Sequence, residues 1–89
     1  MDTAYTYMLK CADGSLYTGW TTDLPKRLAW HNAGKGSRYT RSRLPVELVW
    51  WELHDSRRAA RRAEAKIKRL TRQEKLAILV TSDKAREKI

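Results

Sequence analysis

The chain has 89 residues, enough for one compact domain with little room for a second. Lys and Arg outnumber Asp and Glu by 19 to 10, and the resulting net charge of +9 favours a polyanionic partner such as nucleic acid. No stretch approaches the ~20 apolar residues of a membrane-spanning helix, so we expect no membrane segment, and we expect no secretory leader either. A single cysteine, Cys11, excludes an internal disulfide and fits a reducing cytoplasm.

The N-terminal part of the chain predicts a β-hairpin. Residues 4–11 are rich in aromatic and β-forming side chains, which favour a strand. Asp13-Gly14 predicts a two-residue type I′ turn, because such a turn needs positive φ at both central positions. The returning strand is then expected over residues 15–21.

A short helix and a basic loop are expected next. Thr22 or Asp23 can cap the N-terminus of a helix over residues 24–33, and Gly34 is placed to end it in a left-handed conformation. The following segment, 35–43, has no hydrophobic period and predicts an exposed loop.

The second half of the chain predicts a strand and two helices. The near-continuous apolar run over 46–53 indicates a strand that is central or covered on both faces. A helix over 56–70 follows, capped by Asp55 or Ser56, with a stripe of small and apolar side chains facing the sheet. These are Ala59, Ala60, Ala63, Ile67 and Leu70.

The last helix begins at a capping box, Thr71-Arg72-Gln73-Glu74. Leu76, Leu79 and Val80 are expected to face inward. The element order β-β-α-β-α-α predicts an α+β domain, a small, mainly antiparallel three-stranded sheet flanked by helices, over residues 1–80. A polar tail is expected over 81–89.

Glu64 is the first candidate for chemistry, because it falls beside the apolar stripe of its helix. A helical salt bridge with Lys68 is one interpretation, worth about 0.3–0.5 kcal/mol. The other is a carboxylate ligand for one Mg²⁺ or Mn²⁺ ion, since such ions often use one or two carboxylates with waters and phosphate oxygens.

Four further residues can assist phosphodiester cleavage. Arg27 and His31 share a helix face, where Arg27 can clamp a phosphate and His31 can donate a hydrogen bond or relay a proton. Tyr7 and Tyr17 fall on neighbouring strands, where they are cross-strand aromatics or, for Tyr17, a base assisted by nearby cations. All four also have structural explanations: Arg27 and His31 can be solvated surface residues, and Tyr7 and Tyr17 can be aromatic packing within the hairpin.

Positive charge is clustered rather than dispersed. Nine Lys or Arg residues lie over 57–75 against two acids, and four more lie over 35–43. Clustering favours a phosphate-binding surface, and an aromatic ring within it can stack on a base. The candidate contacts are Lys35, Arg38, Tyr39, Arg41, Arg43 and Lys68.

The ordered motifs resemble those of the GIY-YIG nuclease superfamily, in particular its small stand-alone bacterial branch. Two triplets, Tyr5-Thr6-Tyr7 and, after nine intervening residues, Tyr17-Thr18-Gly19, are similar to the paired signature of that family. The similarity continues through Lys26-Arg27-Leu28, His31-Asn32, Gly34-Lys35-Gly36, Arg41-Ser42-Arg43-Leu44-Pro45 and Glu64-Ala65-Lys66-Ile67-Lys68, and covers roughly residues 4–80.

The resemblance implies a divalent-metal endonuclease that acts on nucleic acid; we expect DNA in preference to RNA, although the charge alone does not separate the two. It implies Tyr17 as general base, Arg27 as transition-state clamp, Glu64 as metal ligand, Tyr7 as an orienting residue and His31 as an assisting one. A cytoplasmic monomer without a small-molecule cofactor is expected.

Two other functions fit the same residues. One is a non-catalytic nucleic-acid-binding module on the same fold, favoured by the charge and by departures from the motifs, such as Tyr-Thr-Tyr in the first triplet. The other is a surface that docks on a larger protein assembly through Trp50 or Trp51.

Overall fold

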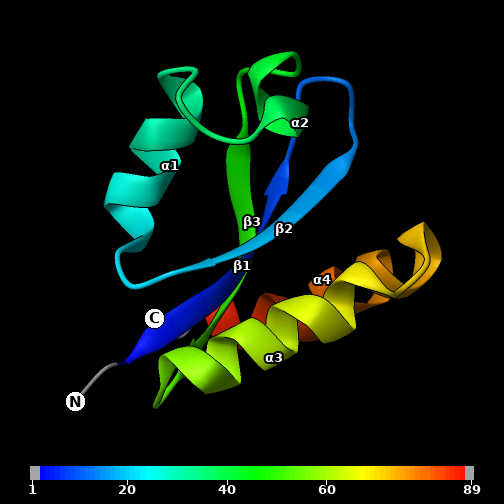
Figure 1. Cartoon of the computed structure of the whole chain (residues 1–89). Coiled ribbons are helices and arrows are strands. Elements are labelled where there is room, and N and C mark those ends of the chain that lie inside the picture. The colour runs from blue at the N-terminus through cyan, green and yellow to red at the C-terminus, as the bar shows by residue number, and fades with distance from the viewer. Residues whose placement is uncertain (1–2, 88–89) are drawn as a thin grey trace.

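The computed structural model describes the backbone of residues 3–87 and the side chains of residues 3–81. Three strands and four helices follow in the order β1 (Ala4–Lys10), β2 (Leu16–Thr21), α1 (Leu24–Asn32), α2 (Arg38–Arg41), β3 (Glu47–His54), α3 (Arg57–Lys68) and α4 (Arg72–Glu87). Helices α1 and α2 lie on one side of the sheet, and α3 and α4 lie on the other (Figure 1). This arrangement confirms the predicted α+β class.

The hairpin forms as predicted, but its turn is of a different type. Gly14 has φ +85, and no residue other than glycine has positive φ among those described, so the type I′ prediction is wrong. The amide of Gly14 donates to the Cys11 carbonyl at 2.9 Å, and the Cys11 amide donates to the Ser15 carbonyl at 2.8 Å. This is the longer hairpin loop in which one left-handed glycine follows an ordinary turn.

The sheet has the order β2-β1-β3 and is antiparallel throughout. The first strand is therefore central. Of the two positions predicted for residues 46–53, the central one is wrong, and the position covered on both faces is confirmed. A bulge explains the apolar run in β3: Met8 pairs with Trp50 and Leu9 with Leu48, which leaves Val49 as an extra residue. The strand consequently contributes apolar side chains to both faces while lying at an edge.

Two cores sandwich the sheet. On the α1 side, Tyr7 and Leu9 are buried with Val46, and Leu28 packs against them. On the α3 side, Met8, Trp50 and Ile67 form the second core, with Leu70, Ile78 and Leu79 packed against it. The alternation of neighbouring residues between faces is the period of two expected of a strand covered on both sides. The predicted stripe of α3 is confirmed at Ala60 and Ile67, which are buried.

The helix ends follow their local chemistry. Asp23 caps α1 by accepting from the Lys26 amide at 3.1 Å. At the other end Gly34, with φ +78, donates to the His31 carbonyl, and the Lys35 amide donates to the Trp30 carbonyl. This pair of bonds is a Schellman motif, as the glycine predicted.

The C-terminal helix confirms one part of its prediction and corrects another. In the capping box, the Glu74 amide donates to Thr71 Oγ1 at 3.2 Å and the Thr71 amide donates to Glu74 Oε1 at 2.9 Å. Leu79 faces the second core, but Val80 is 73% exposed, because the buried face of α4 is centred on Ile78 and Leu79. The expected tail over 81–89 begins inside α4, and its last two residues lie outside the described residues.

Candidate active site

The Tyr7 phenol lies across the neighbouring strand. Tyr7 pairs with Gly19 of β2, and a Cβ added to Gly19 would come within 2.6 Å of the Tyr7 Oη. The glycine of the Tyr17-Thr18-Gly19 triplet therefore makes room for the tyrosine of the first triplet. Tyr17 pairs with Leu9, one diagonal step away, and its ring centroid lies 6.4 Å from that of Tyr7.

His31 lies beneath this phenol and is completely buried. Its Nε2 is 3.0 Å from the Tyr7 Oη, and its Nδ1 is 3.0 Å from Oγ1 of Thr40 on α2. The interpretation of His31 as a solvated surface residue is therefore wrong, because α2 folds over its ring. Both ring nitrogens are engaged within the protein, so His31 acts on anything outside only through Tyr7.

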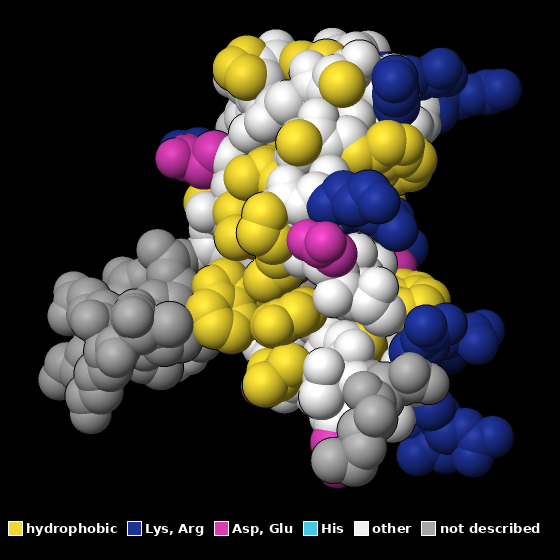
Figure 2. Space-filling model, turned by 90° about the vertical axis from the view of Figure 1, so that its left-hand side faces the viewer, with side chains coloured by type: hydrophobic (Ala, Val, Ile, Leu, Met, Phe, Trp, Pro, Cys, Tyr) yellow, Lys and Arg dark blue, Asp and Glu magenta, His cyan; other side chains and the backbone are white. Residues whose placement is uncertain are grey.

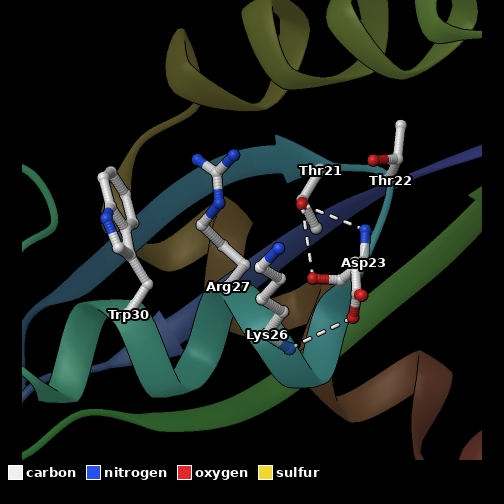
Figure 3. A pocket seen from close by; sticks show the side chains of 6 residues that line it. All are labelled: Thr21, Thr22, Asp23, Lys26, Arg27 and Trp30. Carbon is white, nitrogen blue, oxygen red and sulfur yellow. Dashed lines mark hydrogen bonds between the residues drawn. The ribbon is translucent and has the colours of Figure 1, made fainter.

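Arg27 lies one helical turn before His31 and reaches the same phenol. Its positive charge lies close enough to oppose the rise in the pKa of Tyr7, and its guanidinium lies over the Trp30 ring, 4.7 Å from the centroid. Arg27 and Trp30 extend from α1 in the same direction alongside β2 (Figure 3). With Lys26 and Asp23, they line a hollow of about 400 Å³ that is open to an anionic ligand.

The protonation states of the buried pair follow from this setting. Burial, and then the neighbouring Tyr17, raises the pKa of Tyr7 far above its ordinary 10.0, although the Arg27 charge opposes the shift. Burial, and then the Arg27 charge, lowers the pKa of His31 below 6.5. Near neutral pH, Tyr7 therefore keeps its proton and His31 is uncharged.

Glu64 approaches from the opposite layer. Its carboxylate on α3 acts electrostatically on Tyr7, and its side chain is one-fifth exposed. Lys68 lies 3.3 Å away in the expected i, i+4 pairing. With Arg58, Arg61 and Arg62, Glu64 lines a second hollow of about 520 Å³. Side chains from β2 and α1 thus surround the Tyr7 phenol, and Glu64 of α3 influences it through its charge.

The sequence matches the GIY-YIG catalytic domain over residues 3–77. The chain belongs to the GIY-YIG family. A UPF0213 protein of Streptococcus pyogenes serotype M5 is 59% identical over 85 residues, which cover 94% of this chain and 92% of the relative.

Two solution structures share this GIY-YIG fold. The protein EF2693 of E. faecalis is 42% identical, with a TM-score of 0.62, over 91% of this chain and 86% of its own. The UPF0213 protein BH0048 of Bacillus halodurans is also 42% identical, with a TM-score of 0.59, over 89% and 84% of the two chains. The small stand-alone branch is therefore the part of the family that this chain resembles.

An aromatic stack covers the half-buried Tyr17 of the GIY-YIG site. Tyr39 on α2 stacks against Tyr17 at 6.2 Å and 27°, and the Arg43 guanidinium lies 4.0 Å from the centroid of the Tyr39 ring. Arg43 is held in turn by Asp13 at 3.0 Å. Two predicted nucleic-acid contacts, Tyr39 and Arg43, are thus already engaged within the domain and support Tyr17.

The other predicted contacts lie at the surface. Lys35, Arg38, Arg41 and Lys68 are exposed. Lys and Arg side chains gather along the right-hand side of the face shown in Figure 2, and apolar side chains occupy much of its middle. Within residues 3–87, no helix has the length and apolarity needed to cross a bilayer.

The donor set of this GIY-YIG domain suits a divalent ion that is held by one carboxylate and completes its coordination with waters and a substrate phosphate. Among the described side chains, no three His, Cys, Asp or Glu residues cluster closely enough to hold an ion by themselves. Glu64 offers one partly exposed carboxylate, which lines the hollow formed with Arg58, Arg61 and Arg62. Because Mg²⁺ is commonly held by one or two carboxylates, waters and substrate phosphates, this arrangement suits an ion that binds together with a phosphate.

Sequence reasoning missed three residues of the site: Gly36, Ser37 and Thr40. Ser37 caps α2 by accepting from the Thr40 amide at 3.2 Å, and a serine three residues before a threonine is a helix-start signal that was available. The segment was predicted as a loop because a four-residue helix has too few residues to show a hydrophobic period.

Acid is expected to destabilise the fold through His31. Because the folded-state pKa of His31 is lowered, the unfolded chain binds this proton more readily. The stabilisation is complete above about pH 6.5 and is lost as the pH falls from there through the folded-state pKa. Urea unfolding between about pH 8 and 5.5 measures it, with His54→Gln used to leave His31 as the one histidine. A flat free energy of unfolding across this window would contradict the prediction.

Proposed function

We propose that this chain is a divalent-metal-dependent endonuclease that hydrolyses phosphodiester bonds of nucleic acid. The proposal is supported by the grouping of His31, Tyr17 and Arg27 around the Tyr7 phenol, and by two hollows, one lined by Arg27 and the other by Glu64 and three arginines. A structural salt bridge or hairpin packing explains single members of this set, but not a guanidinium and a carboxylate from opposite layers that both influence one buried hydroxyl through their charges.

Each side chain has a role that its surroundings support. Arg27 lines the first hollow, where its planar guanidinium can hold two oxygens of a phosphate and stabilise charge that builds in the transition state. Tyr17 is half-buried, whereas Tyr7 is 2% exposed, so Tyr17 is the phenol that can contact a water and take its proton. The buried side chains of Tyr7 and His31 orient Arg27 from the interior of the domain.

Glu64 would hold one Mg²⁺ or Mn²⁺ ion, which when bound supplies positive charge to the scissile phosphate. Lys68 now pairs with Glu64, and its ammonium can move to a phosphate oxygen when an ion takes its place. The exposed charges at Lys35, Arg38 and Arg41 are suited to the flanking phosphates. We further propose that the substrate is DNA rather than RNA and that the protein acts as a cytoplasmic monomer.

Nicking of supercoiled plasmid with Mg²⁺ or Mn²⁺ tests this function. Tyr17→Phe and Glu64→Gln are expected to lower the rate about 100- to 1,000-fold each, because each removes a group that acts on the transition state. Glu52→Gln is the matched control, since it removes an exposed carboxylate on β3 and is expected to cleave normally. Chelation of the metal should stop the reaction.

Two outcomes would reject the proposal. Equal cleavage by the wild type and both site variants would mean a contaminant or another site. Tight, salt-sensitive binding without turnover under any metal condition would favour the non-catalytic binding module instead.

A further inference from the structure

A continuous set of hydrogen bonds runs through the buried part of the site, from Tyr7 through His31 and Thr40 to Ser37. At one end the positive charge of Arg27 lies near the Tyr7 oxygen and favours lone pairs, not the phenol proton, on the side that faces it. At the other end the Ser37 carbonyl, which can only accept, lies 3.1 Å from Thr40 Oγ1. The protons between these ends can therefore be assigned.

Starting from Ser37, the Thr40 hydroxyl gives its one proton to the carbonyl. Its oxygen then has only lone pairs to offer to His31 Nδ1 at 3.0 Å, so Nδ1 must carry the hydrogen. A second contact agrees: Ser37 Oγ lies 3.3 Å from the same oxygen and can donate to its other lone pair. In the neutral imidazole, Nε2 consequently carries no hydrogen and can only accept a hydrogen bond.

Starting from Tyr7, the same result is reached independently. The nearby Arg27 charge repels the phenol proton, and among the described residues the hydrogen-bond partner of this hydroxyl is His31 Nε2, 3.0 Å away. The opposite tautomer would point an N–H at that oxygen and leave the proton of a fully buried hydroxyl without a partner, which is unfavourable because a buried donor then loses its water without gaining an acceptor.

We propose that Thr40 is a positioning residue that fixes His31 as the Nδ1–H tautomer, so that His31 Nε2 accepts the proton of the Tyr7 phenol. The phenol proton is thereby turned inward, and the lone pairs of the Tyr7 oxygen face Arg27. This inference rests on the proposed function only for its consequence, which is that Thr40 holds the phosphate clamp in place through two intervening side chains.

The second histidine of the chain provides an internal comparison. Thr6 Oγ1 donates to the Ala60 carbonyl at 2.9 Å, so it must accept from His54 Nε2 at 3.0 Å. The Glu52 carboxylate, 3.4 Å from the same nitrogen, also requires a hydrogen there. His54 is therefore the Nε2–H tautomer, opposite to His31, although each is paired with a threonine.

Nitrogen-15 NMR of the two imidazoles in the full chain, without nucleic acid, tests the assignment near neutral pH. The wild type is expected to show one histidine protonated at Nδ1 and one at Nε2, with His54→Gln identifying which signal is which. Finding His31 protonated at Nε2 would overturn the proposal, and this measurement needs no variant at position 40.

Two substitutions at position 40 test the role of its hydroxyl. Thr40→Val keeps the shape but removes the acceptor for Nδ1–H, so the preference for this tautomer weakens and the Nε2–H form is expected to become populated. Thr40→Ser keeps the hydroxyl and is expected to restore the wild-type tautomer. If Thr40→Val folds and leaves the tautomer unchanged, Thr40 does not fix it.

The nuclease assay separates this inference from the proposed function. Thr40→Val is expected to lower kcat by up to about 100-fold with little change in KM, because the clamp is displaced rather than removed, and Thr40→Ser should recover most of the loss. A wild type that shows the predicted tautomers but never cleaves would reject the nuclease and leave the tautomer assignment standing.

Discussion

Substitution of Arg27 by alanine is expected to lower plasmid cleavage about 100- to 1,000-fold while the domain stays folded. Arg27→Lys is expected to recover little of that loss, because an ammonium keeps the charge but not the planar pair of donors that fits a phosphate. Stability should change by only about 1 kcal/mol, since the contact with the Trp30 ring is partly exposed. Single-turnover cleavage and urea unfolding measure the two effects.

The neighbouring Lys26 gives a matched control. It lies on the same helix, is exposed and lines the same hollow, so Lys26→Ala removes one charge without touching Tyr7. Its expected effect is weaker binding at higher salt rather than slower chemistry. Arg27→Ala should also raise the pKa of His31, because the Arg27 charge helps to depress it. Normal cleavage by Arg27→Ala would remove this residue from the mechanism.

Substitution of Gly36 by alanine is expected to destabilise the fold by several kcal/mol. The added Cβ would overlap His31 Nδ1 and lie 2.8 Å from its Cε1, in a place where the imidazole is fully buried. Overpacking costs about 1–3 kcal/mol, and the displaced ring would also lose its bond to Thr40, worth about 1–3 kcal/mol. For a domain of this size the melting temperature should fall by 10 °C or more, at about 4–8 °C per kcal/mol.

Gly34 provides the comparison, because its constraint is of another kind. A Cβ there meets no atom within 4 Å, but φ is +78, so Gly34→Ala should cost about 1–2 kcal/mol from the left-handed backbone alone. Urea unfolding of both variants ranks the two effects. If Gly34→Ala proves the more damaging, the close packing of Gly36 against His31 is not what constrains that position.

The elements that could be predicted from the sequence are those whose causes are local. Asp23, Ser56 and the Thr71–Glu74 capping box satisfy amides within three residues of themselves, so their side chains alone indicate where helices begin. Gly34 ends α1 for an equally local reason. The hairpin followed from its turn glycine, even though the type of turn did not.

The features that could not be predicted depend on distant contacts. The apolar run of β3 looked like a central strand because a bulge places Val49 and Trp50 against the same core, and a bulge is a property of the pairing with β1. The burial of His31 depends on α2, whose Thr40 lies nine residues further along the chain. Before that contact is known, the spacing of Arg27 and His31 describes only a shared helix face.

The hydrogen-bonded assembly around Tyr7 has a consequence for the order in which the protein can become active during its synthesis. Its members come from β1, α1 and α2, and Glu64 comes from α3, so no half of the chain contains a complete set. A nascent chain would therefore carry no working site until α3 has left the ribosome and closed against the sheet. Of the proposed site, the group formed by Tyr7, Arg27, His31 and Thr40 would thus be synthesised first, and the Glu64 carboxylate would be the last part to join it.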